Sequence, residues 1–385
     1  MKNFSFHNSV NIVFGKGQIS KLNSLIDKKS KVMMLYGGGS IKKNGVYDQV
    51  MTALKDHQVI EFSGIEPNPV YETLMKAVEI IRQEKVDFLL AVGGGSVLDG
   101  TKFISSAVNF KGYTWDIMSK NAPLTEPTLP IGTVLTLPAT GSEMNANFVV
   151  TNKDTQEKLG MNKPEVLPQF SILDPEAIYS LPERQISNGI VDSFIHTTEQ
   201  YLTYPDHGYL QDRQAEGILK TLVEIGPKYL NDKTNYDLAS NFMWCATNAL
   251  NGLIGVGVPQ DWVTHMIGHE LTAFYGVDHG QSLAVVLPGV LEVKRAEKAA
   301  KLVQYAERVW GIQEEDENKK IDLAIQKTID FFESLGVKTR LSDYGINSDK
   351  FNDIKSRFER RGMTAIGERG TFTPDDVVKV LELRQ

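Results

Sequence analysis

The sequence has 385 residues, of which 41% are hydrophobic and 23% charged, and its formal net charge is −7. This length and composition suit a soluble globular protein with two domains. The negative charge argues against nucleic acid as the main partner, because phosphate binding depends on clustered Lys and Arg. The single cysteine excludes an internal disulfide.

The first residues, Met1-Lys2-Asn3-Phe4, lack the apolar core of a signal peptide. No apolar run approaches the roughly 18 residues that a membrane-spanning helix needs. We therefore expect a cytoplasmic protein without a membrane partner.

Residues 1–182 alternate short apolar runs with segments of helical periodicity, which is typical of a parallel α/β sheet. Ten of the fifteen prolines lie at or before Pro182, whereas the later part has the pattern of long amphipathic helices. We predict an α/β domain over 1–182 and an all-helical domain over 183–385.

Two of the apolar runs end in the same glycine turn. Residues 32–36 lead into Gly37-Gly38-Gly39-Ser40, residues 88–92 lead into Gly93-Gly94-Gly95-Ser96, and a helix is predicted after each turn. A strand, a glycine turn and a helix start direct backbone N–H groups toward one point, which suits phosphate. Neither turn is G-x-G-x-x-G, the standard Rossmann fingerprint. One such turn could be purely structural, but two, with Asp99 after the second, favour a dinucleotide.

The first turn also bears on which dinucleotide is bound. NAD-selective sites use a carboxylate at this position for the ribose 2′-hydroxyl, and Gly38, Gly39 and Ser40 offer none. Lys42 and Lys43 follow closely and would tolerate a 2′-phosphate. We therefore expect NADP(H), with the alternative that these lysines are only a solvated surface.

Two further segments could complete a nucleotide site. The strand-like residues 131–137 lead into a turn with Thr140, Gly141 and Ser142, whose hydroxyls suit ribose and pyrophosphate oxygens, although such residues also form ordinary turns. The extended corner around Pro67-Asn68-Pro69 could present Asn68 to the same site.

Histidines cluster in the second half of the chain. Asp192 and His196 are one helical turn apart, and so are His265 and His269, while His279 follows a glycine where a helix could end. Two or three imidazoles and one carboxylate suit a divalent cation such as Fe²⁺ or Zn²⁺. Spacing alone does not choose between His265 and His269 as the ligand. A single apolar-face histidine is most often a core residue, but four such groups together favour a metal.

Other chemistries fit less well. The segment His265-Met266-Ile267-Gly268-His269 is not HExxH, because Met266 stands where a zincin protease has its glutamate. The spacing of Tyr229 and Lys233 matches a Tyr-Lys proton-donor pair, but Lys233 lies in a polar turn. Trp262, Met266, Phe274 and Tyr275 could form an apolar substrate wall, with ordinary core packing as the simpler explanation.

These motifs occur together and in a recognisable order. They are Tyr36-Gly37-Gly38-Gly39-Ser40, Pro67-Asn68-Pro69, Gly93-Gly94-Gly95-Ser96 with Asp99, Thr140-Gly141-Ser142-Glu143, Val258-Pro259-Gln260-Asp261-Trp262, and Asp192, His196, His265 and His279. Over nearly the whole chain the sequence resembles the iron-dependent (group III) alcohol dehydrogenases. Within that family it is most similar to the branch of NADPH-dependent aldehyde reductases and butanol dehydrogenases.

The resemblance implies a Rossmann-like N-terminal dinucleotide-binding domain and an all-α C-terminal domain of the dehydroquinate synthase-like kind, with the active site between them. It implies hydride transfer between NADP(H) and an aldehyde or primary alcohol, one Fe²⁺ or Zn²⁺ acting as a Lewis acid, and a homodimer. A polyol dehydrogenase and a catalytically inactive nucleotide-binding protein are the alternatives.

The resemblance also implies the site residues. The metal ligands are Asp192, His196, His265 and His279, and His269 becomes an additional catalytic histidine near substrate and nicotinamide, where it or solvent relays a proton. The residues implied in cofactor binding are Gly37, Gly38, Ser40, Asn68, Gly94, Gly95, Ser96, Asp99, Thr136, Thr140, Asn145 and Lys158.

Overall fold

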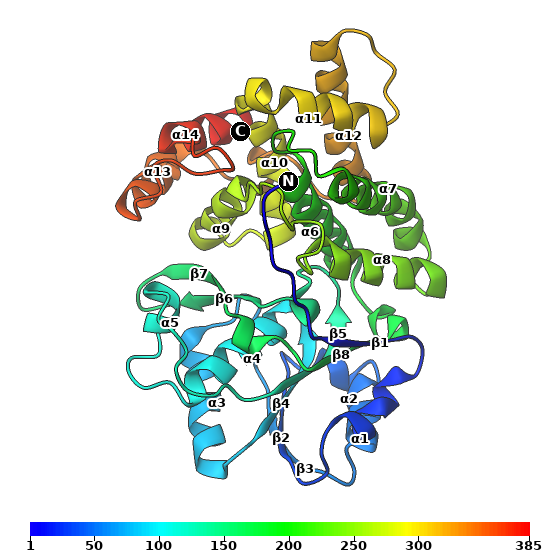
Figure 1. Ribbon diagram of the computed structural model, residues 1–385, viewed down its shortest axis with the longest axis vertical. Helices are drawn as coiled ribbons and strands as arrows, with labels where there is room; N and C mark the ends of the chain where they lie inside the picture. The colour runs from blue at the N-terminus through cyan, green and yellow to red at the C-terminus, as the bar shows by residue number, and fades with distance from the viewer. The chain divides into compact units, whose positions relative to one another are not determined.

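The computed structural model describes residues 1–385, and the chain divides into two units (Figure 1). The sheet unit comprises His7–Leu181 and Lys233–Thr247. The helical unit comprises Met1–Phe6, Pro182–Asp232 and Asn248–Gln385. The chain therefore passes between the units more than once, because most of helix α8 belongs to the sheet unit although it follows α7 of the helical unit.

The sheet unit is built on six parallel strands in the order β1-β8-β5-β4-β2-β3. Their bounds are β1 Asn11–Phe14, β2 Lys31–Leu35, β3 Gln58–Phe62, β4 Phe88–Gly94, β5 Ile131–Leu137 and β8 Phe170–Leu173. The runs in β2, β4 and β5 are buried almost throughout. Continuous apolar runs are what a parallel sheet covered on both faces requires.

Helices cover both faces of this sheet. Helices α1 (Leu22–Leu25) and α2 (Val46–Ala53) pack on one face, while α3 (Tyr71–Glu84) lies on the opposite side in Figure 1 and packs against α4 (Gly95–Val108). An antiparallel hairpin of β6 (Asn147–Asn152) and β7 (Glu157–Asn162) packs against α4. The remaining helices of this unit are α5 (Asp116–Ser119) and α8 (Tyr236–Ala249).

The two glycine turns lead into different structures. At the second turn β4 ends at Gly94 and α4 begins directly at Gly95, so a helix follows the strand as predicted. After the first turn only a short 3₁₀ helix forms at Ser40–Lys42, and α2 begins at Val46. Gly39 and Gly45 have φ angles of 90° and 79°, in the left-handed region, so a continuous helix cannot run through this segment.

The helical unit contains eight α-helices. They are α6 Glu183–Tyr201, α7 Tyr209–Asn231, α9 Val263–Tyr275, α10 His279–Val293, α11 Arg295–Arg308, α12 Glu317–Ser334, α13 Phe351–Arg360 and α14 Pro374–Leu383. Helix α6 is buried along most of its length and packs against α7 and α10. Gly276 ends α9 with a φ of 71°, and the short turn after it allows α10 to pack alongside α9.

These features confirm the predicted fold class, a parallel α/β sheet together with a helical region. No helix in the structure is both long enough and apolar enough to cross a lipid bilayer.

Candidate functional site

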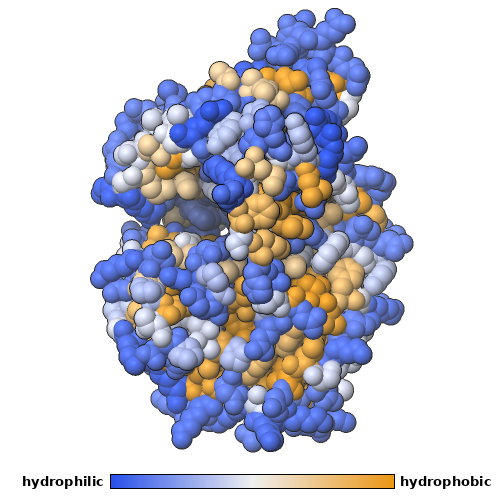
Figure 2. All heavy atoms as spheres, viewed as in Figure 1, coloured by the Kyte–Doolittle hydropathy of each residue, from blue (hydrophilic) through white to orange (hydrophobic).

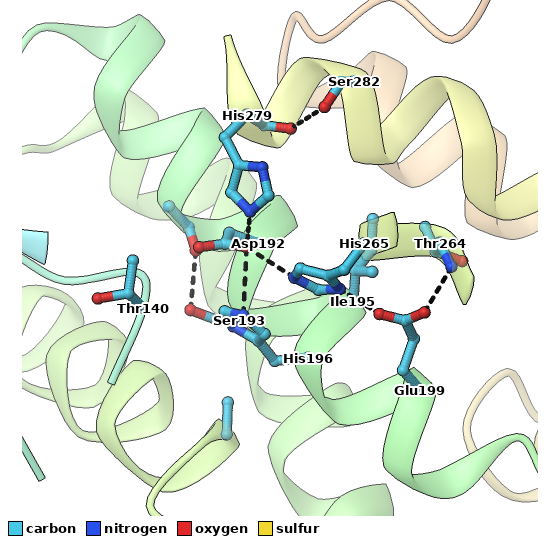
Figure 3. Close-up of polar contacts among 12 residues, drawn as sticks. Thr140, Asp192, Ser193, Ile195, His196, Glu199, Thr264, His265, His279 and Ser282 are labelled. Atoms are coloured by element: carbon cyan, nitrogen blue, oxygen red, sulfur yellow. Dashed lines mark hydrogen bonds and ion pairs between the residues drawn. The ribbon is translucent and has the colours of Figure 1, made fainter. Parts of the chain in front are cut away.

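Three helices of the helical unit bring one carboxylate and three imidazoles together (Figure 3). Asp192 and His196 lie one turn apart on α6, His265 lies in the first turn of α9, and His279 is the first residue of α10. The Asp192 Oδ1 atom is 3.6 Å from the Nε2 atom of each of the three imidazoles. Figure 3 shows the rings of His265 and His279 pointing toward this carboxylate.

The arrangement fits a divalent cation. Asp192 Oδ1 and His265 Nε2 are both buried and have no hydrogen-bond partner, and the 3.6 Å between them is too long for a hydrogen bond. Two ligands about 2.1 Å from one ion in tetrahedral geometry would be about 3.4 Å apart. The ligand atoms of Asp192, His265 and His279 all lie within 4.8 Å of one another. An ion would therefore satisfy buried polar atoms that the protein leaves unsatisfied.

His196 and His269 lie nearest to different rings of this cluster. The His196 ring stacks on the His265 ring, with 4.6 Å between centroids and 15° between planes. His269 lies one turn after His265 on α9, and its ring centroid is 5.2 Å from that of His279. The structure therefore brings His265 to Asp192 and leaves His269 at the edge of the cluster, a choice that sequence spacing left open.

Burial and charge oppose each other at these groups. Burial alone would raise the pKa of Asp192, but His196 and the other two imidazoles hold it well below its usual value. Burial alone would lower the pKa of His265, but the carboxylates of Glu199 and Asp192 raise it to about 9. Asp192 is therefore ionised.

Glu199 is a site residue that sequence reasoning missed. It lies on α6, is 2% exposed, and accepts hydrogen bonds from His265 Nδ1 and from the backbone N–H of Thr264. Asp192, His196 and Glu199 are spaced i, i+4 and i+7, so they share one face of the helix. That spacing was the signal that could have found it.

Trp262 lies beside the cluster in an unusual backbone conformation. Its φ of 68° is in the left-handed region, which is rare for a bulky residue. The indole centroid is 5.4 Å from that of His265 and 6.2 Å from that of His196. By contrast, Met266, Phe274 and Tyr275 pack against the apolar core between α9, α10, α13 and α14. Of the four residues considered for a substrate wall, Trp262 alone flanks the two imidazoles by ring contact.

In the sheet unit, several predicted nucleotide residues meet around the start of α4. The Lys158 ammonium donates to Asn68 Oδ1 over 2.8 Å, and the Asn68 backbone N–H donates to Ser96 Oγ over 3.2 Å. A Cβ added to Gly95 would come within 2.6 Å of the Thr140 side chain, so glycine is required where this turn and loop approach each other. The Asn68 corner, the Thr140 loop and Lys158 on β7 therefore converge on one helix N-terminus.

Asp99 and Lys102, both on α4, form a buried network with residues of the 140–147 loop. Asp99 accepts from Ser142 Oγ over 2.7 Å and from the Val149 backbone N–H over 2.9 Å. The fully buried Lys102 ammonium donates to Ser142 Oγ, Asn145 Oδ1 and the Asn147 carbonyl. Burial lowers the pKa of Lys102 to about 8. Lys102 was absent from the sequence predictions, and here it ties the 140–147 loop to α4.

The first glycine turn holds a second feature that the sequence did not reveal. The Glu61 carboxylate on β3 accepts from the hydroxyls of Tyr36 and Tyr47 and pairs with Lys42 at 3.3 Å. The Lys42 ammonium also lies 4.5 Å from the Tyr47 ring centroid. Glu61 therefore offsets the positive charge of Lys42, one of the two lysines that were expected to favour a 2′-phosphate. The other, Lys43, is exposed. Of the remaining predicted positions, Thr136 is buried near the end of β5, and the space beside Gly38 is open.

Comparison with known sequence families accounts for both units. The family described as iron-containing alcohol dehydrogenase matches residues 9–175, and its C-terminal family matches residues 186–383. The chain belongs to the iron-containing alcohol dehydrogenase family. This confirms the resemblance inferred from the motifs.

Individual members of the iron-containing alcohol dehydrogenase family are similar over the full length. The NADPH-dependent aldehyde reductase YqhD of Escherichia coli K12 is 53% identical over 384 residues, which is 99% of each chain. A solved structure of the E. coli aldehyde reductase YqhD, free of substrate and cofactor, has a TM-score of 0.94 and covers 100% of both chains at 51% identity. The NADH-dependent butanol dehydrogenase A of Thermotoga maritima has a TM-score of 0.94 at 35% identity and covers 100% of this chain and 99% of its own.

The surface of the protein visible in Figure 2 is mainly hydrophilic. Hydrophilic side chains cover most of the visible face, and hydrophobic ones gather in smaller groups between them (Figure 2). This distribution is ordinary for a protein whose apolar residues mostly lie in its cores.

Proposed function

We propose that the protein is a metal-dependent oxidoreductase that reduces aldehydes to primary alcohols with NADPH. The observation that carries the proposal is the buried Asp192 Oδ1 atom, which has no hydrogen-bond partner and is equidistant from three imidazole nitrogens. Membership of the iron-containing alcohol dehydrogenase family supplies the reaction class.

In this proposal the helical unit holds the ion. Asp192, His196, His265 and His279 would be its ligands, and three neutral imidazoles with one carboxylate leave a divalent ion a net charge of about +1. When bound, the ion supplies Lewis acidity toward a carbonyl oxygen and reduced nicotinamide supplies hydride. His269, whose ring lies beside that of His279, would hold the proton that the product oxygen takes up.

The sheet unit would hold the nucleotide. The N-terminus of α4, together with Asn68, Thr140 and Lys158, offers backbone N–H groups, a hydroxyl and an ammonium to pyrophosphate and ribose oxygens. The remaining proposed contacts are Gly37, Gly38, Ser40, Gly94, Gly95, Ser96, Asp99, Thr136 and Asn145. The network through Lys102 would keep the 140–147 loop in place while the nucleotide binds.

The choice of NADPH has two supports. The turn Gly38–Ser40 carries no carboxylate for a ribose 2′-hydroxyl. The relative that is 53% identical is named for NADPH dependence, although the Thermotoga relative is named for NADH. The homodimer and the cytoplasmic location stay predictions.

Partly exposed Trp262 supports an apolar substrate. Its indole flanks the rings of His196 and His265, so an aldehyde carbonyl near the ion would have an apolar surface beside its chain. Short aliphatic aldehydes are therefore the first substrates to test.

The test is a panel of aldehydes and polyols assayed with NADPH and with NADH. The protein is first stripped with a chelator, then reloaded with Fe²⁺ or with Zn²⁺. The proposal expects oxidation of NADPH with simple aldehydes, loss of turnover after stripping and recovery after reloading. Turnover confined to polyols would favour a polyol dehydrogenase, and no turnover in the metal-loaded protein would favour an inactive nucleotide-binding protein.

A further inference from the structure

We infer that Glu199 is a positioning residue for the metal site, acting through His265 rather than by touching the ion; this inference rests on the proposed metal site. Glu199 is buried, and its two carboxylate oxygens have separate tasks. Oε1 accepts from the backbone N–H of Thr264 over 2.7 Å, and Oε2 accepts from His265 Nδ1 (Figure 3).

The contact to His265 decides which ring nitrogen carries the proton. A carboxylate can only accept hydrogen bonds, so Nδ1 must be the protonated nitrogen of a neutral His265 ring. Nε2 then keeps its lone pair, and this is the atom that lies 3.6 Å from Asp192 Oδ1 without a hydrogen-bond partner. Glu199 therefore selects the tautomer that can bind a cation and fixes the ring plane.

The surrounding contacts show that the position of Glu199 is itself fixed. The Asp261 backbone N–H donates to the Glu199 carbonyl over 2.9 Å, so the chain entering α9 is tied to α6 at a second point. The fully buried Lys298 ammonium pairs with Asp261 at 3.0 Å and donates to the Leu202 carbonyl just after α6. The start of α9, which carries His265, is thereby held against the helix that carries Asp192 and His196.

A purely structural role for Glu199 would be to cap α9 through Thr264. Substitution with glutamine separates the two roles. If the glutamine oxygen caps Thr264, its amide N–H₂ faces His265 Nδ1 and holds the ring with its proton on Nε2. If the oxygen faces His265 instead, the N–H₂ group faces the Thr264 N–H and the cap is lost. A capping role alone allows the first arrangement at no cost to metal binding, whereas the positioning role does not.

The experiment compares Glu199→Gln with a matched control, Glu216→Gln. Glu216 is also a buried carboxylate of the helical unit, and it accepts from Tyr201, Arg213 and Arg308 but touches none of the proposed ligands. Zn²⁺ affinity is measured by titrating each metal-free protein in competition with a chelating dye. Thermal unfolding of the metal-free forms reports the structural cost of each substitution.

We expect Glu199→Gln to bind Zn²⁺ about 10–100-fold more weakly than the wild type. Glu216→Gln should stay within about threefold of the wild type even where its unfolding temperature falls. Wild-type affinity in Glu199→Gln would overturn the inference and leave the proposed function standing. Failure of the wild type itself to bind one Zn²⁺ would overturn the proposed function as well.

A second measurement uses only the wild-type protein, so it does not depend on whether a variant folds. In wild-type protein labelled with ¹⁵N-histidine and loaded with Zn²⁺, His265 should show a protonated Nδ1 and a coordinated Nε2. A His265 ring with Nδ1 unprotonated would contradict the role assigned to Glu199.

Discussion

Two buried clusters of charged groups, one in each unit, differ in how completely the protein satisfies them. In the sheet unit, Lys102 donates to three acceptors and both oxygens of Asp99 accept hydrogen bonds. In the helical unit, Asp192 Oδ1 and His265 Nε2 have no hydrogen-bond partner although both are buried. An unsatisfied buried polar group costs about 1–3 kcal/mol, and more when it is charged.

The difference indicates a division between scaffold and binding site. The Lys102 network already contains its own cation and donors, so it can hold a loop permanently. The Asp192 cluster has a carboxylate and three imidazole nitrogens directed at one point, so a cation from outside would complete it. Buried charge alone therefore does not identify a site, whereas several ligand atoms that converge on one point, two of them buried and unsatisfied, do.

The largest expected effect comes from removing the carboxylate of the unsatisfied cluster. Asp192→Ala should lose the ion and the NADPH-dependent turnover together, by about a thousandfold or more, because Lewis-acid stabilisation contributes several kcal/mol. Metal content by elemental analysis and initial rates check this in the same preparations. A variant that keeps both the metal and full activity would contradict the assignment.

Removing the cation of the satisfied cluster should instead affect stability. Lys102→Met leaves the buried Asp99 carboxylate without the positive charge that reaches it through Ser142, and should lower the free energy of unfolding by about 3–5 kcal/mol, with Zn²⁺ affinity unchanged. Thermal or urea unfolding measures the change. The double variant Asp99→Asn/Lys102→Met should regain part of the lost stability. If Lys102→Met were as stable as the wild type, the scaffold role of Lys102 would be contradicted.

The same lysine gives a pH dependence. Its pKa is lowered from 10.5 to about 8 in the folded protein, so between these values the unfolded state binds the extra proton. Stability of the wild type relative to Lys102→Met should therefore rise with pH across this window, by on the order of 1 kcal/mol per pH unit, and be flat below pH about 7. Unfolding temperatures of both proteins at pH 7 and pH 9.5 test the sign; a difference that shrinks as the pH rises would contradict it.

The smallest expected effect concerns the cofactor. Glu61→Gln removes the charge that offsets Lys42, and if the 2′-phosphate lies near this turn, NADPH should bind up to about fivefold more tightly, since an exposed pair contributes at most about 1 kcal/mol. NADH binding should not change. Fluorescence titration with both nucleotides is the measurement, and an equal change for the two would place the phosphate elsewhere.

Much of the fold could be predicted from the sequence because local patterns determine it. The apolar runs of β4 and β5 are continuous since both sheet faces are covered, and the glycines after β4 mark the start of α4. The first turn was harder, because the 3₁₀ helix at Ser40–Lys42 depends on the left-handed backbone of Gly39 and Gly45 rather than on apolar periodicity.

The candidate site was predictable only in part. Asp192 and His196 could be paired by their spacing on one helix, but the choice of His265 over His269 depends on how α9 packs against α6 and α10. Lys102 looked like any helix lysine, and its role depends on a loop more than 40 residues away along the chain, as its hydrogen bond to Asn145 shows. Long-range partners of this kind leave no local pattern in a single sequence.

The most direct test of the account is an anomalous-scattering measurement on crystals of the protein loaded with Zn²⁺. We expect one peak per chain, about 2.0–2.2 Å from Asp192 Oδ1 and from the Nε2 atoms of His196, His265 and His279. A fully loaded crystal with no peak among these four residues would contradict it.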